Sequence, residues 1–446
     1  MSPQHGEAAA VMFGLDPLWL STSILIGTYV VLLSEKIHRT TVALLGAGLM
    51  IISGILTQKQ AFSGIDFNTI ALLTGMMMIV AVTRRTGVFE FVAIWSAKKV
   101  KADPRGVLIV LSVVTAVFSA FLDNLTTVLL VVPVALLIAD KLKVSPYPFL
   151  ISQILASNIG GTATLIGDPP NILIGSATGL TFADFLFTLG PVSVISMIPM
   201  IVLLCFLWPK GLITTPEHRE RVMRFKESDS ITDPRLLKQC LTILFLVIAG
   251  FIIGEHYHIR PGTTAMMGAA VLLLVTSFGT GEQAQGRRLH DALHEVEWVA
   301  LFFFMGLFVV VSGVEHSGLL TLLGKKLMDA TGGNLMVTGI STLWLSAVVS
   351  AAIDNIPFVA TMIPLVDSMA PAFGGPEALT PIWWSLALGA CLGGKGALIG
   401  AAAHVMVSGA GGGAGHPTKV VKIAIIRAPL MPVTTGVNWE RHRLNA

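Results

Sequence analysis

The sequence predicts an all-α polytopic membrane protein built as two related halves. Of its 446 residues, 54% are hydrophobic and only 12% are charged, against about 25% charged in an average soluble protein. Apolar stretches long enough to cross a bilayer recur along the chain, and two short motifs occur twice in the same order. A soluble fold with this composition would expose large apolar patches, whereas a lipid environment accommodates them.

The apolar stretches set the predicted helices. A spanning helix needs about 20 mostly apolar residues, because unpaired backbone polar groups are costly in hydrocarbon. We expect membrane helices at Leu18–Leu33, Thr40–Leu56, Thr69–Thr83, Val107–Leu122, Pro191–Trp208, Leu237–Ile253, Thr264–Phe278, Val296–Val311, Leu335–Ala352, Asn355–Met369 and Ile382–Leu392.

Between Asn124 and Asp184 the apolar pattern is interrupted. Prolines and glycines break it at Pro133, Pro146, Pro148, Gly160–Gly161, Gly167 and Pro169–Pro170. Such interruptions free backbone amides and carbonyls, which persist at membrane depth only where protein or a water-filled cavity covers them. The stretch is therefore interpreted as one short hairpin and one broken helix.

Two motifs form an internal repeat. Phe121-Leu-Asp-Asn-Leu-Thr-Thr-Val resembles Ala352-Ile-Asp-Asn-Ile-Pro-Phe-Val, and Ile159-Gly-Gly-Thr-Ala-Thr-Leu-Ile-Gly resembles Leu392-Gly-Gly-Lys-Gly-Ala-Leu-Ile-Gly. Repeats with broken helices at matching positions are typical of transporters that work by alternating access. An odd number of crossings in each repeat would make the halves inverted, so that the broken elements meet near the middle of the bilayer.

The repeat divides the chain into five parts. We expect an N-terminal tail (1–17), a first transmembrane repeat (18–208), a central loop (209–236), a second repeat (237–417) and a tail or degenerate last helix (418–446). The central loop contains several lysines and arginines, so the positive-inside rule places it in the cytoplasm. The predicted location is a multi-pass protein of the cell inner membrane.

The motifs resemble a known group. Asp123-Asn124, Asn158-Ile-Gly-Gly-Thr, Gly167-Asp-Pro-Pro-Asn and Asp354-Asn355 are similar to the ion transporter superfamily, and within it to the arsenite efflux pumps (ArsB) and NhaD-type permeases, a group that includes the P protein. The resemblance covers roughly residues 40–417. It implies a scaffold domain plus a transport domain that holds re-entrant hairpins and broken helices. Members move arsenite, antimonite, sodium against protons, or organic anions.

Three departures from the family pattern stand out. The second repeat has Gly393-Gly394-Lys395-Gly-Ala397 in place of Gly-Gly-Asn-Gly-Thr, and His404 stands where the first repeat has Asn171. The last spanning helix, after residue 417, is interrupted by charges and prolines. An ammonium at Lys395 suggests that it replaces a bound sodium ion and pairs with Asp354 or Asp123.

Four residues are candidates for proton or ion coupling. Asp123 and Asp354 are carboxylates at membrane depth, where charge is costly and marks function; each can also cap the half-helix that follows it. Lys395 carries the fixed charge of the second repeat, and His404 can titrate near neutral pH.

The candidate substrate contacts surround the two breaks. Amide and hydroxyl side chains can hold a small hydroxylated or charged solute, although they can equally repair the broken backbone. The set comprises Asn124, Asn158, Thr162, Thr164, Asn171, Asn355, Gly160, Gly161, Gly393 and Gly394.

The first functional hypothesis is export of arsenite or antimonite as the neutral trihydroxide, driven by the proton gradient or membrane potential. A sodium/proton antiporter and an organic anion transporter of the same fold are the alternatives, and Lys395 suits an anion. The sequence lacks the Gly-x-Gly-Asp pattern expected of an intramembrane aspartyl protease. A channel is a further alternative that the sequence does not exclude. The resemblance also allows a soluble arsenical ATPase at the cytoplasmic face, and a homodimer is a further hypothesis.

Other classes are not indicated. The three cysteines, Cys205, Cys240 and Cys391, form no metal or disulfide pattern, and no run of basic residues suggests nucleic acid. No nucleotide-binding Gly-x-x-x-x-Gly-Lys-Ser/Thr or zinc-protease His-Glu-x-x-His motif occurs. The sequence thus predicts a transporter, not an enzyme, without cofactor or bound metal.

Overall fold

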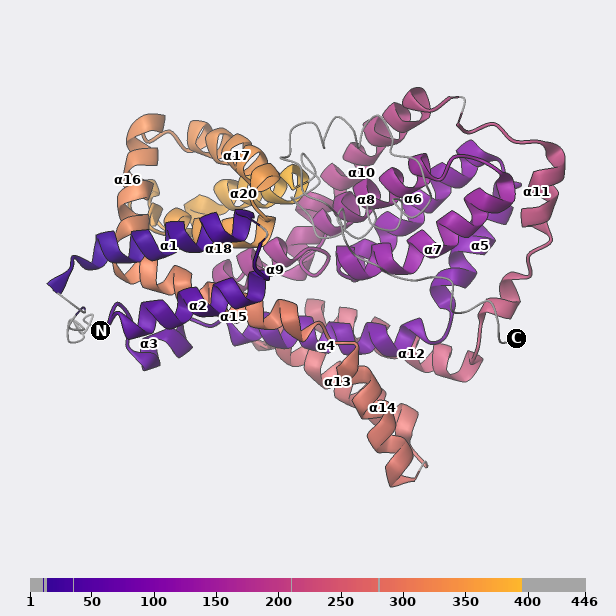
Figure 1. The fold of residues 1–446 in the computed structure, drawn as a ribbon, viewed down its shortest axis with the longest axis horizontal. Coiled ribbons are helices and arrows are strands. Elements are labelled where there is room, and N and C mark those ends of the chain that lie inside the picture. The colour runs from indigo at the N-terminus through magenta and orange to yellow at the C-terminus, as the bar shows by residue number, and fades with distance from the viewer. Residues whose placement is uncertain (1–10, 12–13, 35, 210, 280, 395–446) are drawn as a thin grey trace.

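The computed structural model describes residue 11 and residues 14–34, 36–209, 211–279 and 281–394 (Figure 1). All elements within these residues are helices, which confirms the all-α prediction. Six of them are long and apolar enough to cross a membrane, or seven if the bent pair at 319–351 is one span. The protein is therefore a polytopic membrane protein.

The first half contains ten helices. They are α1 (Pro17–Ser34), α2 (Arg39–Ile52), α3 (Gln58–Ser63), α4 (Phe67–Arg84), α5 (Val88–Lys99), α6 (Pro104–Phe121), α7 (Asn124–Leu142), α8 (Tyr147–Thr162), α9 (Pro169–Thr178) and α10 (Phe182–Leu207). A connection with α11 (Pro216–Met223) and the 3-10 turn η2 (Glu227–Ser230) follows.

The second half repeats this order as far as residue 394. Its elements are α12 (Pro234–Ile253), η3 (Gly254–Tyr257), α13 (Pro261–Ser277), α14 (Glu282–His294), α15 (Trp298–His316), α16 (Leu319–Thr331), α17 (Leu335–Ala352), α18 (Asn355–Asp367), α19 (Ala370–Phe373), η4 (Pro376–Leu379) and α20 (Thr380–Gly393).

The structural repeat is longer than the two motifs that predict it. A constant spacing of 231 residues separates Phe67 from Trp298, Gly87 from Gly318, Asp123 from Asp354 and Pro133 from Pro364. Gly87 and Gly318 both have a left-handed backbone, with φ of 73° and 84°, immediately before α5 and α16. Glycine adopts this conformation without steric cost. Helices α4 to α7 therefore correspond to α15 to α18.

The halves are inverted. Helices α2 and α15 run parallel, because Gly306 faces the backbone of Ala43 and Gly313 faces Met50. Helix α4 runs the other way: Gly64, just before it, lies against Ser312, and Arg84 at its end lies 3.5 Å from Glu295. Counterparts α4 and α15 thus point in opposite directions, as inverted repeats require.

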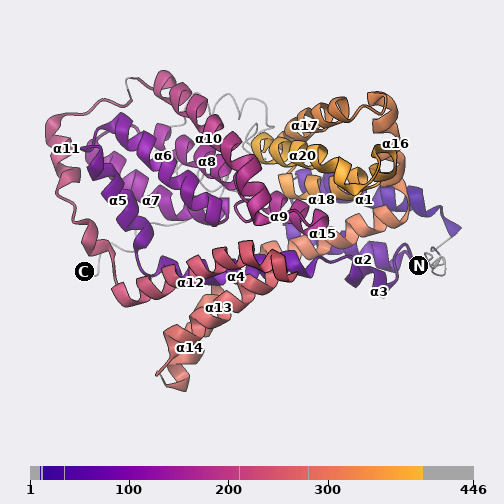
Figure 2. The ribbon, with the colours of Figure 1, turned by 180° about the vertical axis from the view of Figure 1, so that it is seen from behind.

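Two groups of buried apolar side chains form the interior. The larger joins α2, α4, α13, α15, α18 and α20, and the second joins α5, α6, α7, α8, part of α10 and α11. Seen from either side, α5–α8 and α11 gather at one end of the molecule, and α1–α3 with α16–α20 at the other (Figures 1 and 2). Helix α9 lies between the two ends. The division into a scaffold and a transport domain stays a prediction.

Prolines interrupt the helices less than the sequence indicated. Pro133 lies inside α7, and α10 begins at Phe182, ahead of Pro191 and Pro199. A capping box between Thr181 and Asp184 starts α10. A proline removes one backbone donor, and in a membrane neighbouring helices satisfy the freed carbonyl, so the helix continues.

The central connection is anchored to the first repeat. Arg219 bonds Asp103 at 2.7 Å, and Lys98 bonds Glu227 at 2.5 Å. The backbone of Thr232 also donates to the carbonyl of Thr86 at 3.2 Å. These contacts hold 216–232 against α5 and the start of α6; its cytoplasmic location stays a prediction.

Candidate functional site

Two chain breaks at equivalent positions build the framework of the site. Helix α6 ends at Phe121 and α17 at Ala352. The residue that follows each, Leu122 or Ile353, has an extended backbone (φ −122°, ψ 160°; φ −114°, ψ 146°). Each is followed by the Asp-Asn pair that starts the next half-helix. The sequence motif thus marks the position where the helix direction changes in both repeats.

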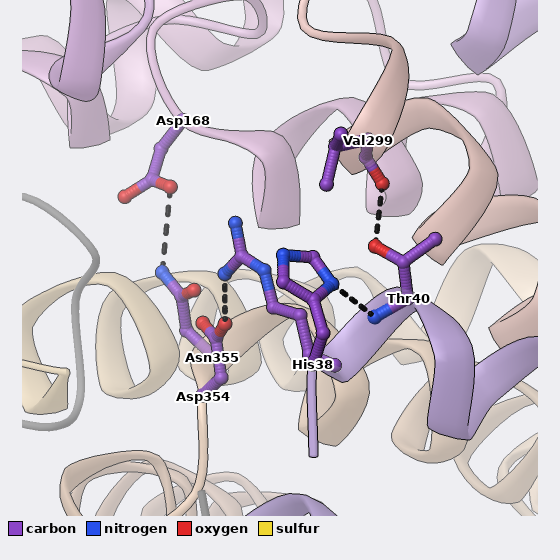
Figure 3. A network of polar contacts seen from close by, with 7 residues as sticks. His38, Thr40, Asp168, Val299, Asp354 and Asn355 are labelled. Carbon is purple, nitrogen blue, oxygen red and sulfur yellow. Dashed lines mark hydrogen bonds and ion pairs between the residues drawn. The ribbon is translucent and has the colours of Figure 1, made fainter.

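The two aspartates have different partners. The carboxylate of Asp123 accepts bonds from the amide (2.8 Å) and the hydroxyl of Thr126, and so caps α7. At Asp354 no cap hydrogen bond has good geometry, although its carboxylate interacts with the backbone N–H groups of Asn355 and Ile356 at the start of α18. The carboxylate also accepts a bond from Nη1 of Arg39, at 3.2 Å (Figure 3). The capping role expected of both aspartates is therefore clearest at Asp123.

The break between α8 and α9 is held by Asn171. Its amide nitrogen donates to the carbonyls of Thr164 at 2.9 Å and Thr162 at 3.2 Å. The hydroxyl of Thr162 donates to the carbonyl of Asn158, and that of Thr164 to the carbonyl of Ala120. Two predicted substrate contacts, Thr164 and Asn171, thus repair broken backbone here, whereas the hydroxyl of Thr162 bonds a carbonyl within α8.

Asn124 and Asn158 form a direct pair. The amide nitrogen of Asn124 donates to Oδ1 of Asn158 at 3.0 Å, which joins the start of α7 to the end of α8. Asn158 is 2% exposed. Each amide keeps further donor and acceptor capacity for a ligand. The structure brings these predicted substrate contacts together.

The two repeats meet at Asp168 and Asn355. Asn355 at the start of α18 donates to Oδ1 of Asp168 at the start of α9, at 3.4 Å, across 187 positions of sequence (Figure 3). Both side chains are buried, at 6% and 1% exposure. Two half-helix N-termini, which carry partial positive charge, therefore converge.

The predicted glycines are packing positions in this structure. A methyl group at Gly160 would lie 2.5 Å from Cα of Ala116, and one at Gly393 would lie 2.5 Å from Cα of Ala347. The first contact joins α8 to α6, and the second joins α20 to α17. Gly161 lies against the carbonyl of Gly167, and Gly394 ends α20. Their role in substrate contact stays a prediction.

Sequence reasoning missed two charged residues of the site, Arg39 and Glu297. Besides bonding Asp354, Arg39 has its guanidinium carbon 5.4 Å from the ring centre of Phe303. Glu297, at the start of α15, interacts electrostatically with both Asp123 and Arg39. The sequence feature that could have identified both residues is a charge at the edge of an apolar stretch, because a charge at membrane depth marks function by default.

Several carboxyl groups lie around the breaks. Among the described residues they are Asp123, Asp168, Asp354 and Glu297, together with the guanidinium of Arg39. A cavity of roughly 20 Å³ beside Asp123, lined also by Met76 and Leu122, has room for about one water molecule. The site is closed around its own side chains in this conformation.

Lys395 and His404 lie outside the described residues, so the expected pairing of Lys395 with an aspartate stays a prediction. Cys391 contacts Oδ1 of Asn171 at 3.4 Å, and the three cysteines form no disulfide bond among the described residues. Within the described ranges, no group of three metal-ligating side chains was found.

Comparison with known proteins identifies the group. A family model described as citrate transporter (CitMHS) matches residues 29–389. The chain belongs to this family. An uncharacterized transporter of Mycobacterium tuberculosis (strain ATCC 25618 / H37Rv) is 42% identical over 432 residues, covering 95% of this chain and 98% of the relative.

Two further matches support the assignment. The P protein of Homo sapiens is 30% identical over 509 residues, which cover 94% of this chain and 59% of the P protein. The YdaH transporter of Alcanivorax borkumensis, whose crystal structure has an unusual topology, has a TM-score of 0.55 at 16% identity, covering 93% of this chain and 95% of that one. This last likeness concerns the fold alone.

These matches make the protein a secondary transporter of the citrate transporter family, within the ion transporter superfamily, and not an enzyme. They give no specific support to the narrower resemblance to arsenite efflux pumps and NhaD-type permeases, nor to arsenite as substrate.

Proposed function

We propose that this transporter moves a small carboxylate-bearing anion together with cations, through a site where α7, α9 and α18 begin. The observation that carries the proposal is the meeting of α9 and α18 at Asp168 and Asn355, with Arg39 bonded to the adjoining Asp354. The family description as citrate transporters points to the same substrate class.

Helix N-termini suit an anion. Each carries a partial positive charge. At α9 this charge is the contribution, because the helix begins with Pro169 and Pro170, which have no backbone N–H. Discontinuous membrane helices use these ends to bind the carboxylates of transported solutes. The guanidinium of Arg39 adds a donor fork that matches carboxylate geometry.

A coupling cation is part of the proposal. Arg39 bonds Asp354, so an anion that binds Arg39 takes the guanidinium away from that carboxylate. A proton or sodium ion that binds with the anion would replace it. The transport cycle is therefore proposed to be cation-coupled, and the protein is proposed to act in the cell inner membrane.

Arsenite is retained as a second candidate because of one contact. The paired amides of Asn124 and Asn158, 3.0 Å apart, can donate to and accept from a neutral trihydroxide. The described cysteines do not converge on the site, so a thiolate cage is not part of this alternative.

Uptake by proteoliposomes distinguishes these substrates. Purified protein is reconstituted, a pH or sodium gradient is imposed, and accumulation of labelled citrate, labelled dicarboxylates and arsenite is followed. We expect gradient-driven accumulation of a carboxylate, absent from protein-free liposomes. Accumulation of arsenite without any carboxylate would replace the proposal with the second candidate.

A further inference from the structure

Arg39 and Asp354 form an ion pair that a solute can reach. Nη1 of Arg39 lies 3.2 Å from Oδ2 of Asp354, and the two side chains are 35% and 25% exposed. Arg39 begins α2 in the first repeat, whereas Asp354 lies at the α17–α18 break of the second, 315 positions away. The pair therefore joins segments from both halves at the proposed site.

The pair is suited to exchanging partners. Partly exposed ion pairs contribute little to folding stability, so breaking this one does not endanger the fold. The ring of Phe303 keeps the guanidinium in place when its carboxylate partner leaves, because arginine is attracted to an aromatic face.

We propose that Arg39 and Asp354 are the two halves of one binding device: the substrate carboxylate takes the place of Asp354 on Arg39, while the coupling cation takes the place of Arg39 on Asp354. This inference rests on the proposed function and names the residues that link the anion to its cation. Asp354 and Arg39 separate by a side-chain movement, and no covalent bond changes.

Coupling follows from charge pairing. An anion that binds Arg39 alone leaves the Asp354 carboxylate without its partner, and a cation on Asp354 alone does the same to Arg39. Because the two side chains are partly exposed, an unpaired charge here costs less than in a fully buried site, but it still weakens the binding of a ligand that binds alone. Anion and cation together leave both side chains paired, so each ligand raises the affinity of the other by the same factor.

Arg39 is the charged side chain that contacts Asp354 among the described residues. Glu297 of α15 interacts electrostatically with Arg39 and with Asp123 at the α6–α7 break. Asp168 at the start of α9 bonds the neighbouring Asn355. His38 precedes Arg39 and lies beside it (Figure 3). When Arg39 turns to the substrate, the carboxylate of Asp354 is left to a proton or a sodium ion.

Binding of labelled citrate to the purified full-length protein, measured across pH and sodium concentration, tests the device. Wild-type affinity is expected to depend on one of these cations. Arg39→Gln is expected to weaken binding at least tenfold, because a charge-assisted bond is lost. Asp354→Asn, which leaves Arg39 free, is expected to bind citrate with little cation dependence.

Controls separate this result from misfolding. Arg219→Gln breaks the similarly exposed pair with Asp103 (2.7 Å) in the central connection and should leave affinity unchanged. The double variant Arg39→Gln/Asp354→Asn leaves no unpaired charge; it should elute as folded protein, bind weakly and lack cation dependence.

Two outcomes overturn the inference. If wild-type binding is cation-dependent and Asp354→Asn retains that dependence, the coupling cation binds elsewhere. If Arg39→Gln binds like the wild type, the anion does not use Arg39. If the wild type binds no carboxylate at all, the proposed function falls together with the inference.

Discussion

Replacing Gly160 by alanine should separate α8 from α6. The added methyl carbon would lie 2.5 Å from Cα and 2.6 Å from the carbonyl carbon of Ala116, and these are backbone atoms that no side-chain rotation can move. Overpacking of this kind costs about 1–3 kcal/mol. The gain in helix propensity, about 0.5–1 kcal/mol, offsets part of that cost. Subtracting this gain leaves a net loss of about 0–2.5 kcal/mol, or more if the helices cannot shift.

The same change elsewhere provides matched comparisons. Gly393→Ala meets Cα of Ala347 at 2.5 Å in the second repeat and should behave alike. Gly190→Ala, in α10, meets only a side-chain carbon of Leu186 at 3.8 Å, so it should be neutral or stabilising.

The unfolding temperatures of the variants in detergent can be compared from the monodisperse fraction that remains on size-exclusion chromatography after heating. We expect Gly190→Ala to unfold at or above the wild-type temperature, and Gly160→Ala and Gly393→Ala to unfold a few degrees below it. If Gly160→Ala were as stable as Gly190→Ala, the close backbone approach of α6 and α8 would be wrong.

Three further predictions concern the site and the central connection. Asn171→Ala should destabilise the protein by about 1–3 kcal/mol, because buried backbone carbonyls at the α8–α9 break lose their donor; protease resistance of the reconstituted protein measures this. Asp123→Asn keeps an oxygen that accepts from the amide of Thr126 but removes the charge. The variant should therefore fold, while its cation-driven uptake should fall. Equal loss of folding in Asp123→Asn and Asp123→Ala would contradict this. A hydrogen bond from Lys98 holds the pKa of Glu227 below its ordinary value, so this contact should persist above about pH 4.5 and be lost as pH falls through the lowered value. The hydrogen-exchange protection factors of the amides at 227–230, taken against the intrinsic exchange rate at each pH, should fall only in that acid range. Unchanged protection there would refute the assignment.

The helix breaks could be predicted from the sequence. The Asp-Asn pairs mark them, because an aspartate can cap the new half-helix, as Asp123 does. This signal depends on a few neighbouring residues and can be recognised without a fold. The Gly-Gly pairs were predicted as substrate contacts; in the structure Gly160 and Gly393 lie at close helix contacts, where a methyl group would collide with backbone.

Long-range partners could not be predicted in the same way. Arg39 and Asp354 are 315 positions apart, and Asp168 and Asn355 are 187 apart. Only the packing of the inverted repeats brings them together. The sequence also predicts an interruption at Pro133 that the structure does not have. Helix α7 continues through this proline, because tertiary contacts outweigh one missing hydrogen bond.

The central claim is that the translocation path passes through the helix breaks where the repeats meet. Cysteine labelling tests it most directly: Asn355→Cys is introduced after Cys205, Cys240 and Cys391 are replaced by alanine. Membrane-impermeant maleimide is then applied to right-side-out and to inverted vesicles, with and without citrate. The account predicts reaction from both sides and slower reaction with citrate present. Reaction from neither side, or from one side without any effect of citrate or of the other substrates, would contradict it.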